Sequence, residues 1–208
     1  MIEYRLLSRN DFNSLHECFL AAFADYEVDM RMSHEQFRQR IVRDGVSLEL
    51  SAGAFDGNRM IGFCINAVGQ WQRKSTAYDA GTGIVPAYRG RGVAKELFVF
   101  LESKLKEAGV VQYLLEVLTS NIPAATLYRK LGFVETRRLA ATAGNSCRQR
   151  QYGHARQRKA HPSDDRGHRH TLIRITKLVT YTFGVNNVLI TVDLNLSRPL
   201  MRAGTRHL

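Results

Sequence analysis

The stretch that decides the fold of this 208-residue chain is Gly83-Ile84-Val85-Pro86-Ala87-Tyr88-Arg89-Gly90-Arg91-Gly92-Val93-Ala94. A strand-like pattern over residues 76–85 leads into it, and helical spacing of apolar residues follows it. The unpaired N–H groups and the dipole of a helix N-terminus attract anions, so the sequence predicts a phosphate or pyrophosphate site here. Gly90 and Gly92 let the backbone approach such a ligand, and Arg89 and Arg91 add positive charge.

Two other phosphate-binding motifs are excluded by the residues of this loop. A Walker loop ends in Gly-Lys-Ser/Thr, whereas the two residues after Gly92 are apolar. The dinucleotide fingerprint requires a third glycine, but Lys95 stands at that position after Gly90 and Gly92. The match that remains is Arg/Gln-x-x-Gly-x-Gly/Ala over residues 89–94, and the alternative is an ordinary glycine turn with solvated arginines.

Strand and helix patterns alternate on both sides of this loop. Apolar alternation and turn residues predict strands over residues 2–7, 47–55, 60–68, 76–85 and 113–118, and a further strand from residue 133. Helical spacing predicts helices over residues 12–23, 33–44, 93–108 and 121–131. The second of these begins with a capping box formed by Ser33 and Gln36. The predicted order is therefore β-α-α-β-β-β-α-β-α-β.

A second signature follows the strand at residues 113–118. It is Asn121-Ile122-Pro123-Ala124-Ala125-Thr126-Leu127-Tyr128-Arg129-Lys130-Leu131-Gly132-Phe133. Two ordered signatures at this separation are far more specific than either alone. On both together, residues 2–139 resemble the GNAT superfamily of acyl-CoA N-acyltransferases. The resemblance implies an α/β (α+β) fold with a mixed, mainly antiparallel sheet and helices on both faces.

The resemblance also implies how the chain would bind its co-substrate, acetyl-CoA. The coenzyme would lie where the two central strands, residues 76–85 and 113–118, move apart, and no metal is expected. Asn121 would contact the pantetheine arm. The backbone near the strand end would bind the thioester carbonyl and the same arm through Ile84 and Val85. The pyrophosphate would be held by Arg89, Gly90, Arg91, Gly92, Val93 and Ala94.

Three residues are candidates for proton transfer. The resemblance implies that Tyr128 lies near the sulfur and protonates the departing thiolate, and a phenol is a usable donor at neutral pH. The alternative is a core aromatic on the helix face of Leu127 and Leu131. Asp79 and Glu116 lie on the two central strands, where a buried carboxylate with a raised pKa could accept the proton of the amine. Either carboxylate could equally be structural, and a water chain could replace both.

The charge of the chain is unevenly distributed along the sequence. The net charge is +11, yet residues 1–136 contain 16 basic and 16 acidic side chains, while residues 137–208 contain 14 basic and 3 acidic ones. This break predicts a GNAT domain over residues 1–139 and a basic tail over residues 140–208, with a linker-like or disordered first part. Apolar alternation returns over residues 172–196 and predicts a hairpin there.

Three accounts of the tail follow, because the family adds a final strand pair after Phe133 and only its first strand is evident. The tail could bind nucleic acid, supply a late hairpin that completes the sheet, or be translated out of frame near residues 139–145. The abrupt break favours the third account, which predicts an open sheet edge, a poorly soluble or homo-oligomeric chain, and rapid cleavage of the tail by trypsin. A long structureless insert counts against the hairpin, and the lack of interleaved aromatics counts against RNA stacking.

Composition narrows the class of protein further. No run of about 18 apolar residues suggests a membrane span, and the N-terminus lacks a signal-peptide pattern, which together favour a cytoplasmic protein without a membrane partner. Cys18, Cys64 and Cys147 are too widely spaced to indicate a zinc site or a disulfide framework, and the first two are expected to be buried. The predicted function is acetyl transfer from coenzyme A to a small-molecule or peptide amine in a ternary complex. The alternative is a non-catalytic GNAT-like module whose tail binds nucleic acid.

Overall fold

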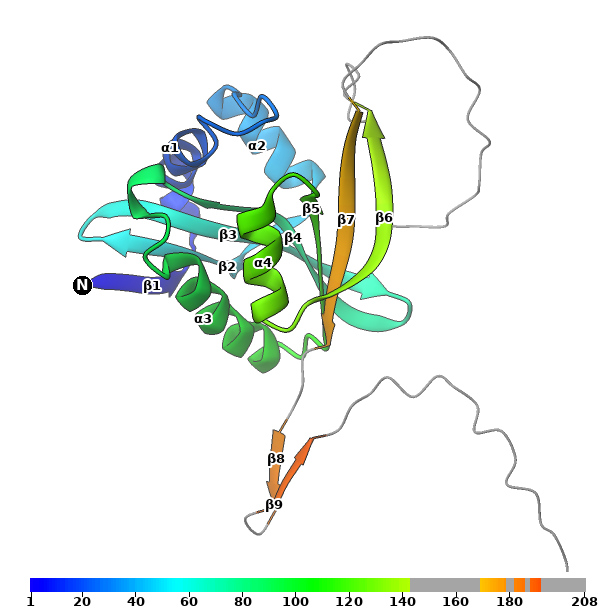
Figure 1. Ribbon diagram of the computed structural model, residues 1–208. Coiled ribbons are helices and arrows are strands. Elements are labelled where there is room, and N and C mark those ends of the chain that lie inside the picture. Colours follow the sequence, from blue (N-terminus) through cyan, green and yellow to red (C-terminus); the bar gives the residue numbers. More distant parts are fainter. Residues whose placement is uncertain (143–168, 179–181, 186–187, 192–208) are drawn as a thin grey trace, which may run out of the picture.

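The computed structural model describes residues 1–142, 169–178, 182–185 and 188–191 (Figure 1). Up to the strand after residue 133, the order of its elements is the predicted one. The helices are α1 (Phe12–Ala22), α2 (His34–Arg43), α3 (Val93–Glu107) and α4 (Ile122–Lys130), with short 3-10 helices η1 (Arg9–Asp11) and η2 (Pro86–Tyr88). The strands are β1 (Ile2–Leu6), β2 (Val46–Asp56), β3 (Arg59–Trp71), β4 (Lys74–Ile84), β5 (Gln112–Leu118), β6 (Val134–Thr142), β7 (Arg169–Leu178), β8 (Thr182–Val185) and β9 (Val188–Thr191).

Seven of these strands form one sheet in the order β1-β2-β3-β4-β5-β7-β6. Every neighbouring pair is antiparallel except β4 and β5, which are parallel. A parallel pair needs a crossover connection, and α3 supplies it between β4 and β5. The prediction of a mixed, mainly antiparallel sheet is confirmed.

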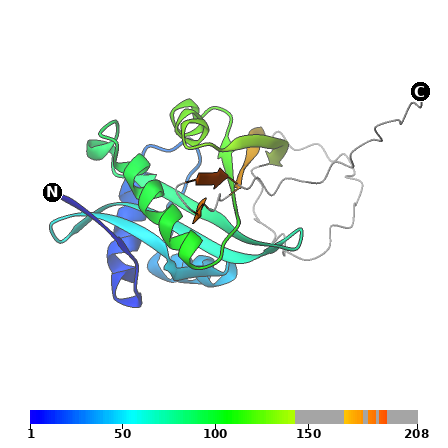
Figure 2. The same cartoon turned by 90° about the horizontal axis from the view of Figure 1, so that it is seen from below.

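Helices cover both faces of this sheet (Figures 1 and 2). Successive side chains of a strand point to opposite faces. Along β3, Phe63 and Ile65 therefore pack in the cluster that contains Phe37 of α2, whereas Cys64 between them packs in the cluster that contains Leu101 of α3. The capping box that begins α2 is present, as predicted. Cys64 and Cys18 are buried, as expected, and Cys147 lies outside the described residues.

The two parallel strands separate after a short paired segment. Their ladder joins residues 76–78 to residues 112–114, although β4 continues to Ile84 and β5 to Leu118. A bulge at Ala80 in β4 lies immediately beyond the paired segment. Because a bulge bends and twists its strand, it explains why β4 leaves β5 at this point. Beyond the bulge, the described ladder partner of β4 is β3 alone.

Strand β7 lies between β5 and β6, so a segment of the predicted tail belongs to the sheet. Residues 172–178 pair with β5 and residues 169–176 pair with β6. This differs from a single hairpin over residues 172–196, because the hairpin in the structure pairs β8 with β9 in a separate sheet. The predicted linker-like segment lies mostly at residues 143–168, outside the described residues, so the reading-frame hypothesis stays a prediction.

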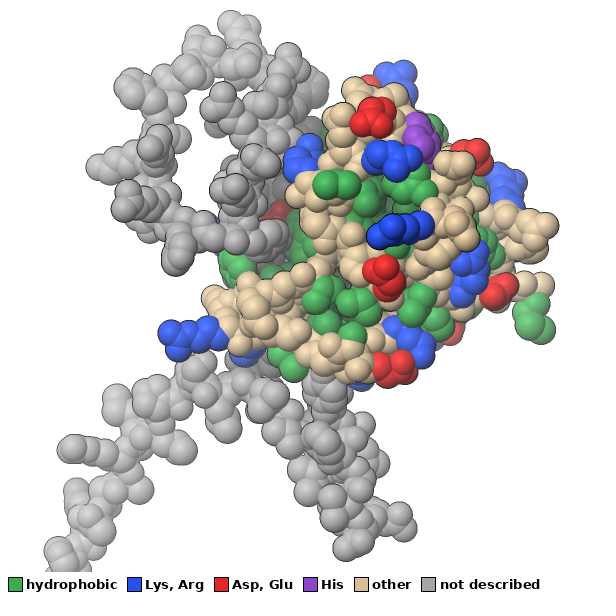
Figure 3. Space-filling model, turned by 180° about the vertical axis from the view of Figure 1, so that it is seen from behind, with side chains coloured by type: hydrophobic (Ala, Val, Ile, Leu, Met, Phe, Trp, Pro, Cys, Tyr) green, Lys and Arg blue, Asp and Glu red, His purple; other side chains and the backbone are tan. Residues whose placement is uncertain are grey.

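Charged side chains on the described part of the chain are mixed in sign. The space-filling view from behind shows Lys and Arg interspersed with Asp and Glu over the same face (Figure 3). This distribution agrees with the equal numbers of basic and acidic residues in residues 1–136. The face shown therefore lacks the continuous basic stripe that is typical of nucleic-acid binding.

Candidate active site

The predicted phosphate loop connects β4 to α3 and leaves open space at the helix N-terminus. Gly90 and Gly92 have φ angles of 72° and 81°, a region that costs other L-residues roughly 1–2 kcal/mol. Gly92 is the N-cap of α3, and a Cβ added at either glycine would meet no atom within 4 Å. The N–H of Glu96 makes the first helical bond, to the carbonyl of Gly92, so the preceding N–H groups have no partner inside the helix. The space and the donors both fit a pyrophosphate.

The two arginines of this loop have different surroundings. The Arg89 guanidinium donates to both carboxylate oxygens of Asp25, at 2.7 and 2.8 Å, and to the carbonyls of Ala22 and Ile84, at 2.8 and 3.0 Å. This contact lowers the pKa of Asp25, and it commits the charge of Arg89 to the segment after α1. The Arg91 guanidinium, in contrast, lies 5.3 Å from the centre of the Tyr88 ring and has no ion pair among the described residues. Arg91 is therefore the side chain of this loop that is available to phosphate.

On the other side of the gap, Asn121 begins α4. Its Oδ1 accepts a 3.2 Å hydrogen bond from the N–H of Ala124, so the side chain caps the helix. A cavity of about 280 Å³ adjoins it and is lined by Asp25, Tyr26, Glu27, Arg89, Leu118, Ser120, Asn121 and Pro123. The predicted pantetheine contact therefore borders a cavity between the two loops that follow β4 and β5.

Residues 25–27, directly after α1, connect to both of these loops. Asp25 binds Arg89 on the β4 side. On the β5 side, the hydroxyl of Ser120 donates a 2.5 Å hydrogen bond to Glu27, and Tyr26 lines the same cavity as Asn121. The segment thus spans the gap. The sequence did not predict that residues 25–27 contact both loops, because polar residues after a helix give no signal of where their partners lie.

Tyr128 lies on the buried side of α4. Its ring packs against Phe98 and Phe133, with ring centres 5.5 and 5.7 Å apart, and the residue is 7% exposed. Burial raises the pKa of the phenol well above its usual value, and the charge of Asp79 raises it further. The ring is therefore a core aromatic, and its phenol lies close enough to Asp79 to be affected by the charge of that carboxylate.

Asp79 lies at the bulge of β4 and forms a small polar cluster with Gly81 and Thr82. Its Oδ1 accepts the N–H of Gly81 at 2.8 Å, and its Oδ2 accepts the hydroxyl of Thr82 at 2.7 Å. Burial raises the pKa of Asp79 to about 6, and these two hydrogen bonds oppose the shift. Thr82 therefore holds one carboxylate oxygen of a predicted catalytic residue. The sequence did not predict a role for Thr82, because a threonine between two glycines matches no motif.

Glu116 is not part of this cluster. Along β5, Tyr113, Leu115 and Val117 pack in the cluster of α3 and α4, so alternation directs Glu116 to the face of α1 and α2. Its strand position is paired with Arg174 of β7. The structure thus separates the two carboxylate candidates onto opposite faces of the sheet.

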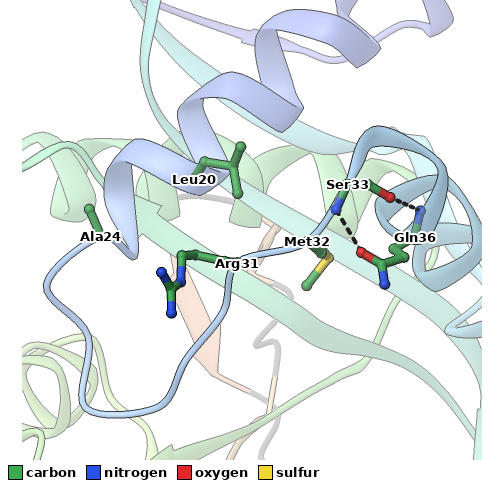
Figure 4. Close-up of a pocket in the computed structure, with 6 residues that line it drawn as sticks. All are labelled: Leu20, Ala24, Arg31, Met32, Ser33 and Gln36. Carbon is green, nitrogen blue, oxygen red and sulfur yellow. Dashed lines mark hydrogen bonds between the residues drawn. The ribbon is translucent and has the colours of Figure 1, made fainter.

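A second, more open cavity of about 650 Å³ lies at the start of α2. Figure 4 shows its lining residues, with Ser33 and Gln36 joined by the bonds of the capping box. Leu20, Ala24 and Met32 supply apolar surface, and Arg31 supplies an exposed charge that pairs with Asp29 at 2.8 Å. The groove is therefore amphipathic and lies on the α1–α2 side of the molecule.

A family comparison agrees with the fold described above. The model of the Acetyltransferase (GNAT) family matches residues 12–133, more than half of the chain. This chain belongs to the GNAT acetyltransferase family. One curated relative is the N-alpha-acetyltransferase MAK3 of Arabidopsis thaliana, which is 33% identical over 86 residues. That match covers 41% of this GNAT chain and 45% of the relative, so the chain spans less than half the length of the relative it matches.

Solved structures agree with the GNAT fold. The ribosomal-protein-S18-alanine N-acetyltransferase of Escherichia coli superposes with a TM-score of 0.60 at 21% identity, covering 90% of this chain and 99% of that one. The acetyltransferase yncA of Salmonella typhimurium, solved with its cofactor acetyl-CoA, superposes with a TM-score of 0.58 at 14% identity, covering 86% and 94%. At these identities the likeness concerns the fold alone.

Within residues 1–142, 169–178, 182–185 and 188–191, no helix is both long and apolar enough to span a membrane. The same ranges contain no group of three or more His, Cys, Asp and Glu side chains placed to hold a metal ion.

Proposed function

We propose that this chain is an acetyl-CoA-dependent N-acetyltransferase that passes the acetyl group directly to an amine in a ternary complex. The observation that carries the proposal is the separation of β4 from β5 next to the open, glycine-capped N-terminus of α3. The gap offers unpaired strand backbone to an extended chain, and the helix end offers donors to an anion. An extended arm attached to a pyrophosphate has both features, as coenzyme A does.

The residues then take distinct roles around the gap. Acetyl-CoA would supply the acetyl group as a thioester. The first N–H groups of α3, with Arg91, hold its pyrophosphate, and the backbone of Ile84 and the side chain of Asn121 bind its pantetheine arm. Tyr128 donates a proton to the sulfur as the C–S bond breaks, and no step requires a metal. Glu116 is the proposed acceptor of the amine proton, since it lies on the face of α1 and α2.

We further propose that the acceptor is the α-amine of a polypeptide. The Arabidopsis relative is an N-alpha-acetyltransferase, and the E. coli structure is that of a ribosomal-protein-S18-alanine N-acetyltransferase, so both are named for N-acetylation and the second for a protein substrate. The amphipathic groove beside Arg31 supports this proposal, because an open groove of about 650 Å³ with apolar lining residues has room for the residues that follow an N-terminal amine. A small amine would have no use for a groove of this size.

The test uses the full chain, acetyl-CoA and three matched acceptors: a peptide with a free N-terminus, the same peptide blocked at its N-terminus but with a free lysine, and spermidine. Mass spectrometry should find acetylation of the free α-amine with a kcat/KM at least tenfold above that of the other two. Initial-rate lines that intersect when both substrates vary would agree with a ternary complex, whereas parallel lines would contradict direct transfer. A preference for spermidine would overturn the proposed acceptor class and leave the acetyltransferase activity intact.

A further inference from the structure

The Arg89 side chain connects the end of α1 to the loop that follows β4. Its guanidinium binds both carboxylate oxygens of Asp25, at 2.7 and 2.8 Å, and donates to the carbonyls of Ala22 and Ile84, at 2.8 and 3.0 Å. These bonds use four of the five N–H groups of the guanidinium. At most one N–H group is left for a phosphate, so the contacts of Arg89 are those of a clamp between two segments of the protein.

Close packing at Gly83 brings the same two segments together. A Cβ added at Gly83 would lie 2.9 Å from the Cβ of Ala22 and 2.9 Å from the ring of Phe63, closer than real Cβ atoms approach. The end of α1 therefore lies directly against the end of β4, through a contact that a larger residue would break. The junction thus rests on two independent contacts, one apolar at Gly83 and one charged at Arg89.

Residues 24–27, which follow α1, border two cavities. Ala24 lines the open groove of about 650 Å³ that Figure 4 shows. The next residue, Asp25, lines the cavity of about 280 Å³ that also borders Asn121. The groove is the proposed acceptor site, and Asn121 is the proposed contact of the pantetheine arm. Because Arg89 binds Asp25, the clamp acts where the acceptor side and the coenzyme side of the site meet.

We propose that Arg89 is a positioning residue that fixes residues 24–27 between the two cavities and so determines where the acceptor amine meets the thioester. This inference rests on the proposed acetyltransferase function and assigns Arg89 to the acceptor side of the site. It separates the two arginines of one loop, because Arg91 is the side chain available to phosphate. Arg89 should therefore affect the KM of the acceptor, and Arg91 the affinity for acetyl-CoA.

The clamp orders a short segment and adds little to the stability of the whole fold. The side chains of Arg89 and Asp25 are 44% and 55% exposed, and an ion pair in such surroundings contributes little to the free energy of unfolding. A bidentate contact between a guanidinium and a carboxylate nevertheless fixes the orientation of both groups. Further along the segment, the Ser120 hydroxyl donates to Glu27 at 2.5 Å. Loss of the clamp should therefore release one end of residues 24–27 while the fold persists.

The first measurement compares Arg89→Met with Arg91→Met in the full chain. Arg89→Met should raise the KM of a peptide with a free N-terminus by about tenfold, because the acceptor is no longer held in position. Its Kd for acetyl-CoA, measured by calorimetry, should change by less than about twofold, since the lost pair is exposed and does not bind the coenzyme. Arg91→Met should weaken acetyl-CoA binding by about tenfold or more, the usual loss for one charge-assisted hydrogen bond. Equal losses of acetyl-CoA affinity in the two variants would make Arg89 a phosphate ligand and overturn the proposal.

Asp25→Ala is a variant for which the two possible roles of Arg89 give opposite results. If Arg89 is a clamp, Asp25→Ala should raise the peptide KM as Arg89→Met does. The double variant should then be no worse than Arg89→Met alone, because both changes remove the same contact. If Arg89 were a phosphate ligand, the freed guanidinium would bind acetyl-CoA more tightly. Tighter acetyl-CoA binding with an unchanged peptide KM would therefore refute the clamp.

Lys104 and Glu107 supply a matched control at the other end of α3. They form an exposed ion pair of 2.8 Å, and Lys104→Met removes it without touching either cavity. This variant should match the wild type in peptide KM and in acetyl-CoA affinity. A peptide KM that rises as much in Lys104→Met as in Arg89→Met would show a general effect of lost surface charge and would refute the specific role of Arg89.

Hydrogen exchange of the free protein, measured by NMR, tests the clamp without any activity. The N–H of Tyr26 donates to the carbonyl of Phe23 at 3.1 Å, so its exchange reports opening of the segment. Exchange at Tyr26 should quicken by about fivefold or more in Arg89→Met and stay unchanged in Lys104→Met. Unchanged exchange in both variants would refute the clamp. Faster exchange in Arg89→Met, together with a wild type that acetylates no amine, would uphold the clamp and refute the proposed function instead.

Discussion

Strands β4 and β5 each have a first half that pairs with the other strand and a second half that does not, and the two halves have different physical roles. Over residues 76–78 and 112–114 the strands are paired and contribute Ala77 and Tyr113 to the core. Beyond the bulge at Ala80, the strands separate, and each leads into a loop and a helix N-terminus. One irregular residue therefore separates a paired, structural segment from an unpaired one that can take the proposed coenzyme. The polar residues and the open glycines gather in the second half because that is where the backbone is unpaired.

The largest effect is expected from a negative charge placed at the N-terminus of α3, next to the unpaired half of β4. Gly92→Asp should lower acetyl-CoA affinity by about a hundredfold or more, because like charges in contact cost several kcal/mol. The fold should survive, since aspartate is a favourable N-cap residue. Calorimetry with acetyl-CoA measures the effect.

Gly109 offers a matched control at the other end of α3. It has a φ of 76° and open space around it, so Gly109→Asp imposes a similar backbone strain away from the coenzyme. Its acetyl-CoA affinity should equal that of the wild type. Equal losses in both variants would mean that strain, and not charge at the loop, explains the effect.

The second test compares two buried tyrosines of the same aromatic cluster. Tyr128→Phe should lower kcat by about a hundredfold, within the range typical of general acids, while acetyl-CoA affinity stays near normal. Tyr113→Phe should instead lower stability and spare kcat, since the Tyr113 hydroxyl donates to Asn66 at 2.7 Å within the paired half. Stopped-flow thiol release and urea unfolding of both variants separate these effects. An unchanged kcat in Tyr128→Phe would leave Tyr128 as a core aromatic only.

The third test concerns the stability of the fold against pH. The folded pKa of Asp79, about 6, exceeds its unfolded value, so the folded state binds the proton more tightly. The resulting stabilisation is complete below about pH 4 and is lost as pH rises through 6. Asp79→Asn keeps both hydrogen-bond contacts without the charge. It should therefore be more stable than the wild type by about 2 kcal/mol at pH 7, and about equally stable at pH 4. If the difference in unfolding free energy between Asp79→Asn and the wild type did not vary with pH, folding would not shift the pKa of Asp79, as expected for a solvated carboxylate.

The fourth test concerns strand β7, which lies between β5 and β6 in the sheet. If β7 is paired on both sides, the trypsin sites at Arg174 and Lys177 should resist cleavage in the native chain, since cleavage needs local opening of the strand. Rapid cleavage there would favour the out-of-frame account. Resequencing the coding DNA near the codons for residues 139–145 tests that account independently.

The sequence predicted those features that depend on local chemistry. The loop glycines, the capping box at Ser33 and the helix signature ending at Phe133 each have a fixed spacing, and each occurs where expected. What the sequence did not predict depends on contacts between distant segments. The pairing of Arg89 with Asp25 and the closeness of Asp79 to Tyr128 arise only when the fold brings distant segments together. The placement of β7 between β5 and β6 was not predicted either. The alternation of apolar and polar residues indicates a strand but not which strands it pairs with.

The most direct test of the central claim is a thiol-release assay of the full chain with acetyl-CoA and a library of peptides with free N-termini. The account predicts thiol release that depends on the peptide and equals the amount of N-acetylated product. Saturable binding of acetyl-CoA with no release above the rate without acceptor, for peptides and small amines alike, would contradict it and would identify the gap between β4 and β5 as a binding site without catalysis.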